Sequence, residues 1–282
     1  MAKIMFRRSS VLVVFVLLSV FFPGSARAAV PVATSQWASS PVTIDGLDGD
    51  WGGCPFYHDK KSGADFAFRN DGRNLYVLMI VKNPASSKAP QTTGIKIFGR
   101  PGKSGTPGSG VLFLTRQVSA AAYIGWQVSQ GAVLTEAEKA EIRKSGPREI
   151  HLAFAVGAKG STFGPLGRPA RGQAPDFGVA GREDGTAYEF LIPLASPEEI
   201  PGAIGALPGG TLRMSFEWGG SHKEELSTPA SGERQGSNSG YVSGTGRTWS
   251  QEFLDTFDPM ARPSSGAEKS SFSVDVKLAE SR

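Results

Sequence analysis

Three aspartates, Asp45, Asp48 and Asp50, stand close together in the segment VTIDGLDGDW, residues 42–51. Clustered carboxylates are ligands that hard cations such as Ca²⁺ prefer, so these three residues are a candidate calcium site. The spacing lacks the distal Glu of an EF-hand loop, which excludes that motif. A structural interpretation is also open, because Asp-Gly pairs form turns and Trp51 can close one end of a folded domain.

Trp249 is the tryptophan with the best case for exposure to solvent. It lies in a stretch rich in Gly, Ser and polar residues, together with Asn238, Tyr241 and Arg247. An aromatic ring with hydrogen-bonding neighbours in a loop predicts either a ligand platform or a lid over the core. We therefore take Trp249, Tyr241, Arg247 and Asn238 as candidate ligand-binding residues. Trp126 shares a face with Ile124 and Val128, and Trp218 shares one with Met214 and Phe216, so both are expected in the core.

No motif for catalysis is present. The chain has neither a G-x-S-x-G elbow nor an H-E-x-x-H pair, and its three histidines are far apart in the sequence. Cys54 is the only cysteine, so no intrachain disulfide can form, and its Gly and Pro neighbours favour a buried small residue over a reactive thiol. These observations predict a protein that is not an enzyme.

The N-terminal segment has the pattern of a secretory signal peptide. Lys3, Arg7 and Arg8 precede the apolar run VLVVFVLLSVFF at residues 11–22, and Ala26-Arg27-Ala28 fits the A-x-A cleavage pattern. The apolar run is too short to span a bilayer comfortably. We predict cleavage after Ala28, no transmembrane anchor after cleavage, and an extracytoplasmic location in the periplasm, on the cell surface or in the medium.

Removal of residues 1–28 changes the charge balance. The whole chain has 30 Lys and Arg against 26 Asp and Glu, and the removed segment holds four of the basic residues and no acidic residue. The remaining 26 basic and 26 acidic side chains give a net charge of about zero. The apparent basic character therefore gives no support to nucleic-acid binding.

The expected elements are mostly strands, because apolar residues recur with a period of two. Asn74–Lys82 is apolar on both faces and predicts a central strand, whereas Thr211–Trp218 has one apolar and one polar face. The other expected strands are Ala64–Arg69, Gly94–Phe98, Val111–Leu114, Ala122–Val128, Glu149–Val156, Ala187–Leu194 and Ser271–Leu278. Together they predict an all-β fold, an antiparallel two-sheet sandwich of jelly-roll type.

One short surface helix is expected at Glu136–Lys144. Thr135 and Glu138 form a capping-box pattern before it, and Gly146 and Pro147 follow it. Residues 157–185 and 229–250 are rich in Gly, Pro and Ser and are expected to be long loops. The predicted organisation is a signal peptide at 1–28, a linker at 29–40 and a single sandwich domain at 41–279.

Three segments resemble family 9 carbohydrate-binding modules and the related DOMON-type sandwiches. Residues 42–51 match their I-D-G-x-x-D-x-W turn, residues 70–77 (NDGRNLYV) match the turn before a central strand, and residues 188–194 (YEFLIPL) match an E-x-x-I-P-L strand. The resemblance implies a non-catalytic exported protein that binds a carbohydrate or a cell-envelope polysaccharide through exposed aromatic and polar residues.

Two other functions stay open at this point. Some DOMON-type relatives hold a haem, and the residues available here as ligands would be Met79, Met214, His151 and His222, although none of them lies in a recognisable motif. A surface module that binds another protein through a strand edge or a loop is the third hypothesis.

Overall fold

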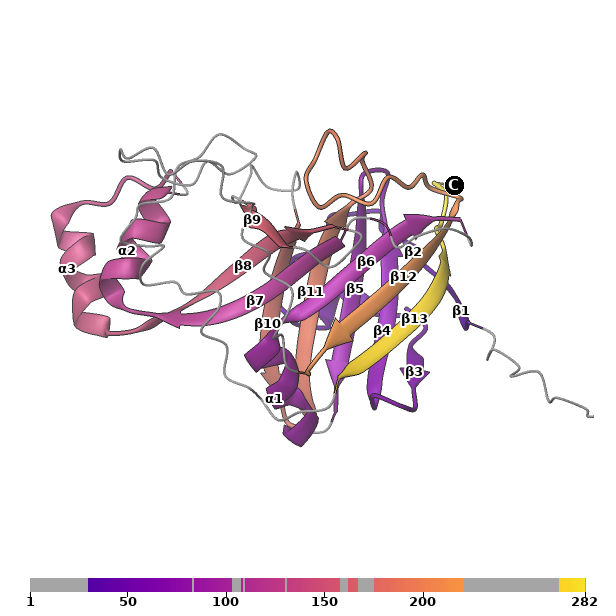
Figure 1. Cartoon of the computed structure of the whole chain (residues 1–282), viewed down its shortest axis with the longest axis horizontal. Coiled ribbons are helices and arrows are strands. Elements are labelled where there is room, and N and C mark those ends of the chain that lie inside the picture. Colours follow the sequence, from indigo (N-terminus) through magenta and orange to yellow (C-terminus); the bar gives the residue numbers. More distant parts are fainter. Residues whose placement is uncertain are drawn as a thin grey trace, which may run out of the picture.

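The computed structural model describes residues 30–82, 84–102, 108, 110–129, 131–157, 162–166, 175–220 and 269–281. Within these residues two sheets form a sandwich (Figure 1). The seven-stranded sheet has the order β1 (Val32–Thr34), β13 (Ser270–Lys277), β12 (Thr211–Trp218), β6 (Ile95–Pro101), β7 (Gly110–Val118), β8 (Arg148–Val156) and β9 (Thr162–Leu166). The six-stranded sheet has the order β10 (Asp176–Arg182), β11 (Gly185–Pro193), β5 (Asn74–Val81), β4 (Ala64–Asn70) and β2 (Gln36–Trp37), with β3 (Tyr57–Asp59) paired to β4.

The sequence periodicity predicted β5 and β12 correctly. All eight residues of β5 are buried, and β5 lies between β11 and β4, as its two apolar faces indicated. Strand β12 alternates between half-buried and buried residues along its whole length. The all-β sandwich predicted from the sequence is therefore confirmed.

Two strand pairs differ from the antiparallel expectation. β1 pairs with β13 and β2 pairs with β4 in parallel, while the other pairs are antiparallel. Both parallel pairs involve residues 32–37, which lie inside the predicted linker at 29–40. These short strands have too few residues to show a period of two, and they form because long strands elsewhere offer them an edge.

Three short helices occur among the described residues: α1 (Pro84–Thr93), α2 (Ala120–Ser129) and α3 (Glu136–Ser145). Helix α3 is the predicted one, and both hydrogen bonds of its Thr135–Glu138 capping box are present. Helices α2 and α3 lie beyond the end of the β7–β8 hairpin, at one side of the sandwich (Figure 1). In the described part of the chain, no helix combines the length and the apolar character needed to cross a membrane.

Helix α2 corrects the prediction of a strand at Ala122–Val128. Its first residues are three alanines, which have the highest intrinsic helix propensity. Ser119 lies just before the helix, and its hydroxyl oxygen accepts a hydrogen bond from the Ala122 backbone N–H at 3.2 Å. The alternating Ile124, Trp126 and Val128 suggested a strand, but capping and propensity favour the helix.

Residues 157–185 were expected to be one long loop, yet they contain β9 and β10. Strand β10 has little apolar periodicity because glycines interrupt it at positions 178 and 181. It forms through seven residue pairs with β11, from Asp176↔Leu191 to Arg182↔Gly185. The partner strand, and not the local sequence, determines this element.

Apolar residues form three clusters within the described residues. The main cluster fills the space between the sheets, a second lies on β7 and β8 under α2, and a third covers the other face of the six-stranded sheet. The third includes Val42, Trp51 and Cys54 from the segment before β3. Cys54 is buried, as predicted, and its thiol donates a hydrogen bond to Gln36 Oε1 at 2.9 Å.

The carboxylate of Glu189 holds the residue 45–51 turn against this face. Glu189 lies on β11 with no exposed surface. One carboxylate oxygen accepts hydrogen bonds from the backbone N–H groups of Asp45 at 3.0 Å and Gly46 at 3.1 Å. The other accepts one from the Trp51 indole N–H at 2.7 Å. The motif at 42–51 and the motif at 188–194 therefore form one hydrogen-bonded unit.

Gly46 allows the turn to lie directly on β10. Its φ of 81° is in the left-handed region, and a Cβ there would be 2.6 Å from the Ala180 backbone nitrogen. Across the contact, a Cβ on Gly178 would be 2.6 Å from the Gly46 nitrogen. Two glycines thus meet where the turn crosses the strand, and this contact fixes Ile44 and Asp45 beside β10.

We expect Glu189→Gln to lower the free energy of unfolding by about 1–3 kcal/mol, because an amide NH₂ would face an N–H donor that now donates to a carboxyl oxygen. Urea unfolding below pH 4.5, where the contribution of Glu189 is fully present, measures the change by tryptophan fluorescence. Val133→Ala is the matched control, since that side chain is 95% exposed. A Glu189→Gln protein as stable as the wild type would contradict the proposed role of the carboxylate.

Two buried carboxyl groups, Glu189 and Asp65, should make stability depend on pH in opposite directions. Burial raises the pKa of Glu189, so its contribution to stability is present below its ordinary value of 4.5 and is lost as the pH rises through the folded-state pKa. Asp65 accepts hydrogen bonds from Lys82 Nζ at 2.6 Å and His58 Nδ1 at 2.7 Å. Burial alone would raise the pKa of Asp65, but these bonds lower it, so its contribution is present above 3.8 and is lost at lower pH.

Unfolding curves of the wild type, Glu189→Gln and Asp65→Asn between pH 2.5 and 8 test this difference. The difference in free energy of unfolding between the wild type and Glu189→Gln should become smaller as the pH rises above about 4.5. The difference between the wild type and Asp65→Asn should become smaller as the pH falls below about 3.8. Parallel pH profiles for the two variants would contradict the assignment.

Candidate functional site

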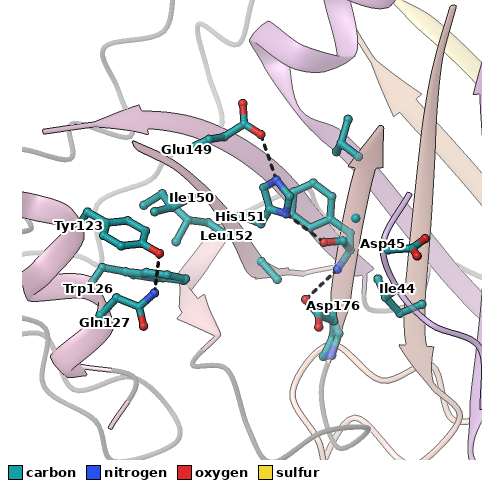
Figure 2. Close-up of a pocket in the computed structure, with 15 residues that line it drawn as sticks. Ile44, Asp45, Tyr123, Trp126, Gln127, Glu149, Ile150, His151, Leu152 and Asp176 are labelled. Carbon is teal, nitrogen blue, oxygen red and sulfur yellow. Dashed lines mark hydrogen bonds and ion pairs between the residues drawn. The ribbon is translucent and has the colours of Figure 1, made fainter. Parts of the chain in front are cut away.

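A pocket of about 280 Å³ lies where β8, β10 and α2 come together with the turn before η1 (Gly49–Trp51). Tyr123, Trp126 and Gln127 line one side, and Ile44 and Asp45 lie on the opposite side (Figure 2). The residues between the two sides come from β8 and β10: Glu149, Ile150, His151, Leu152, Ala153, Asp176, Phe177, Gly178 and Val179, with Pro175 before β10. The pocket thus combines an aromatic side with carboxylates, an imidazole and an amide.

Helix α2 supplies the aromatic side of the pocket. Tyr123, Trp126 and Gln127 are separated by three and four residues, so they lie on one face of the helix. The Tyr123 and Trp126 ring centroids are 5.7 Å apart, and both residues pack against the second apolar cluster. The Gln127 side-chain amide donates a hydrogen bond to the Tyr123 hydroxyl at 2.7 Å. Trp126 is half-buried, so part of its indole is left for contact with a ligand.

His151 lies in the middle of the pocket and links the two sheets. Its Nδ1 is 3.2 Å from the Phe177 carbonyl oxygen on β10, and its Nε2 is 3.2 Å from Glu149 Oε1 on β8. Both oxygens are acceptors here, so both contacts are made together only when each ring nitrogen carries a hydrogen. The ring also lies 4.8 Å from the Phe177 ring, centroid to centroid. These contacts fix the imidazole and the Glu149 carboxylate in the wall of the pocket.

The edge of β8 contributes backbone groups to the same pocket. Strand β7 pairs with β8 along residues 148–156, whereas the pairing of β9 with β8 begins only at Ala153. Residues 149–152 therefore have a strand partner on one side only among the described residues. Within the described part of the chain, the peptide N–H and C=O groups on the second side of these residues therefore have no strand partner.

Asp45 and Asp176 place two further carboxylates at the pocket. Asp45 is exposed, and its Oδ1 accepts a hydrogen bond from the Leu47 N–H at 2.8 Å. Asp176 begins β10, and its Oδ1 accepts one from the Phe177 N–H at 3.0 Å. Asp45 has a second carboxylate oxygen, Oδ2, that can accept a hydrogen bond from a hydroxyl group.

The three aspartates of the predicted calcium site point to different partners. Asp48 Oδ2 is 2.5 Å from Arg182 Nη1, and this hydrogen bond holds the pKa of Asp48 below its usual value. Asp50 Oδ2 accepts a hydrogen bond from the Thr43 N–H at 2.8 Å. Only Asp45 lines the pocket. No group of three or more His, Cys, Asp or Glu suited to a metal occurs among the described residues, and calcium binding by these aspartates stays a sequence prediction.

The predicted loop residues cannot be compared with this pocket. Asn238, Tyr241, Arg247 and Trp249 lie outside the described residues, and so does His222. Of the other residues considered for haem, Met79 and Met214 are fully buried in the main cluster. His151 is the one of these three that lines the pocket.

Most of the pocket residues were not predicted from the sequence. Tyr123 and Gln127 were not considered, and Trp126 was assigned to the core of a strand. The signal that identifies them is local: Ser119 and three alanines begin a helix, which places residues 123, 126 and 127 on one face. Glu149 and Asp176 have no local signal, because only the packing of β8 near β10 brings them together.

Comparisons with known proteins give a likeness in structure. No protein-family model and no curated protein sequence matches the chain. Two solved structures of a family 9 carbohydrate-binding module from Caldicellulosiruptor kristjanssonii are similar to it, one with glucose and one with cellotriose. Each has 15% identity and a TM-score of 0.33 and covers 88% of this chain, with 97% and 94% of the module covered, respectively.

A third similar structure is a protein from Bacteroides uniformis that is proposed to bind carbohydrate. It has 13% identity and a TM-score of 0.36, with 68% of this chain and 85% of that chain covered. Solved structures similar to the chain thus include family 9 carbohydrate-binding modules.

Proposed function

We propose that the protein is a non-catalytic, exported module that binds a carbohydrate in the pocket between α2, β8 and β10. The observation that carries the proposal is the position of Trp126 and Tyr123 in the same small pocket as His151, Glu149 and Asp176. A sugar ring has apolar C–H faces and a rim of hydroxyl groups. The pocket offers an aromatic side for the former and fixed hydrogen-bonding groups for the latter.

The position of each polar group supports this assignment. Gln127 and His151 are held by hydrogen bonds at 2.7 Å and 3.2 Å, so a ligand meets groups that are already oriented. The carboxylates of Glu149 and Asp45 can accept hydrogen bonds from hydroxyl groups. Residues of β8 that have one strand partner among the described residues add backbone donors and acceptors. A volume of about 280 Å³ is suited to a sugar unit and not to a large cofactor.

The wider setting is part of the same proposal. The signal-peptide pattern at residues 1–28 supports delivery to an extracytoplasmic compartment, where the ligand would be an envelope or environmental polysaccharide. Asn238, Tyr241, Arg247 and Trp249 stay predicted contributors from a segment outside the described residues. No sequence motif supports catalysis in addition to binding.

Replacement of Trp126 tests the site. We expect the folded wild-type protein to bind at least one polysaccharide on a glycan array, and Trp126→Ala to lower the affinity for that glycan about tenfold or more. Isothermal titration calorimetry measures the affinity. Gln127→Ala should weaken binding without disturbing the apolar contacts of Trp126. Phe56→Ala is the matched control, because Phe56 is 46% exposed and does not line the pocket.

Two results would contradict the proposal. One is a folded wild-type protein that binds no glycan, and the other is unchanged affinity in both pocket variants. A thermal unfolding curve for each variant distinguishes loss of binding from loss of fold.

Export can be tested separately from binding. Expression of the full chain in a bacterium with a secretory pathway should give a mature protein that begins at Ala29, as measured by mass spectrometry of the purified product. Replacement of the small residue at the cleavage site, Ala28→Leu, should leave the precursor uncut. An intact N-terminus in the exported wild-type protein would contradict cleavage after Ala28.

A further inference from the structure

A second cleft, of about 930 Å³, lies at the other lateral edge of the sandwich. It is lined by two neighbouring segments, residues 34–37 with Ser39 and residues 277–281, and by Gly209. These segments belong to or follow β1, β2 and β13. β1 is one edge of the seven-stranded sheet, and β2 ends the strand order of the other sheet. The first pocket, at β8 and β10, lies toward the opposite edges of both sheets.

A buried hydrogen-bond network holds the two segments of the cleft together. The Ser35 hydroxyl oxygen and Asn70 Oδ1 both accept hydrogen bonds from the Ala279 backbone N–H, each at 2.9 Å. Asn70 Nδ2 donates in return to the Ala279 carbonyl oxygen at 3.0 Å. Ser35 is 4% exposed and Asn70 has no exposed surface. The two segments are therefore fixed before any ligand arrives.

Trp37 is the aromatic residue of this cleft, and no apolar cluster of the described residues includes it. It is half-buried. By contrast, Trp51 and Trp218 are 2% and 3% exposed and belong to clusters. A partly exposed indole beside hydroxyl and amide groups is the combination that binds a ring with one apolar face and a polar rim.

The charges of the cleft indicate the class of ligand. Its ionisable side chains are Lys277 and Glu280, one of each sign, and its other polar side chains are neutral: Thr34, Ser35, Gln36, Ser39 and Ser281. Such a lining gives no preference for an anion or a cation. Its volume is also larger than the 280 Å³ of the first pocket, which suits several linked units better than one.

We propose that this cleft, with Trp37 as its aromatic wall, is a second saccharide-binding site that takes several units of an uncharged oligosaccharide. It goes beyond the site at Trp126 and does not depend on it. Because the two sites lie at opposite edges of the sandwich, one molecule can hold two segments of polysaccharide, and their joint effect on insoluble polymer exceeds either site alone.

The test uses soluble neutral hexasaccharides and the purified full protein. Cellohexaose, laminarihexaose and xylohexaose are titrated by calorimetry into the wild type, Trp37→Ala, Trp126→Ala and the double variant. We expect Trp37→Ala to remove one class of sites or to weaken it about tenfold or more, and to leave the class that depends on Trp126 unchanged. Ser39→Trp, at an exposed position, should block the cleft without removing any packed side chain.

Each outcome decides the proposal. Loss of a hexasaccharide site in both Trp37→Ala and Ser39→Trp, with unchanged thermal unfolding of Ser39→Trp, supports the second site. If both variants bind like the wild type while Trp126→Ala loses binding, the second site is overturned and the function proposed for the first pocket stands. If Trp37→Ala and Ser39→Trp lose binding but Trp126→Ala does not, the second site stands alone. No binding of any hexasaccharide to the folded wild type overturns it.

Discussion

The buried carboxylate of Glu189 is the constraint on which the arrangement of the site depends. A carboxylate on a central strand with no exposed surface is costly unless its oxygens accept hydrogen bonds, and here three N–H groups from residues 45–51 meet that need. The same bonds fix the turn on the face of the six-stranded sheet, where Gly46 and Gly178 allow it to touch β10. The position of one wall of the pocket therefore follows from the hydrogen bonds that one buried carboxyl group accepts.

The strands that could be predicted from sequence are those whose burial follows a local pattern. β5 is apolar on both faces and β12 on one. Both were predicted because the alternation of residue types within each strand indicates which faces are buried. β1, β2 and β10 have no such apolar pattern, and they form by pairing with the longer strands β13, β4 and β11. The prediction for α2 was wrong for another reason. Its apolar residues alternate as in a strand, but the Ser119 cap and the three alanines at the start of the segment favour a helix.

The candidate site was less predictable than the fold, because its residues come together only through long-range packing. Asp45, Asp48 and Asp50 were predicted to form one calcium site. Asp48 instead pairs with Arg182, Asp50 accepts a hydrogen bond from the Thr43 N–H, and Asp45 is the one of the three that lines the pocket. Glu149 and Asp176 are ordinary acidic residues in the sequence. They come together in the pocket because β8 lies near β10, where His151 contacts both Glu149 and the Phe177 carbonyl oxygen.

The sandwich also explains why both proposed sites lie at edges and not on a sheet face. One outer face is covered by the third apolar cluster, and the other is divided between the cluster under α2 and cross-strand polar pairs. Among those pairs are Arg213–Asp275, with an Nε–Oδ1 distance of 2.6 Å, and Ser215–Ser273, with hydroxyl oxygens 2.9 Å apart. The tryptophans left half-buried in the described residues, Trp37 and Trp126, accordingly stand beside the lateral edges. Among the described residues, backbone groups without a strand partner and partly exposed indole rings occur together there, and the two proposed saccharide sites use this combination.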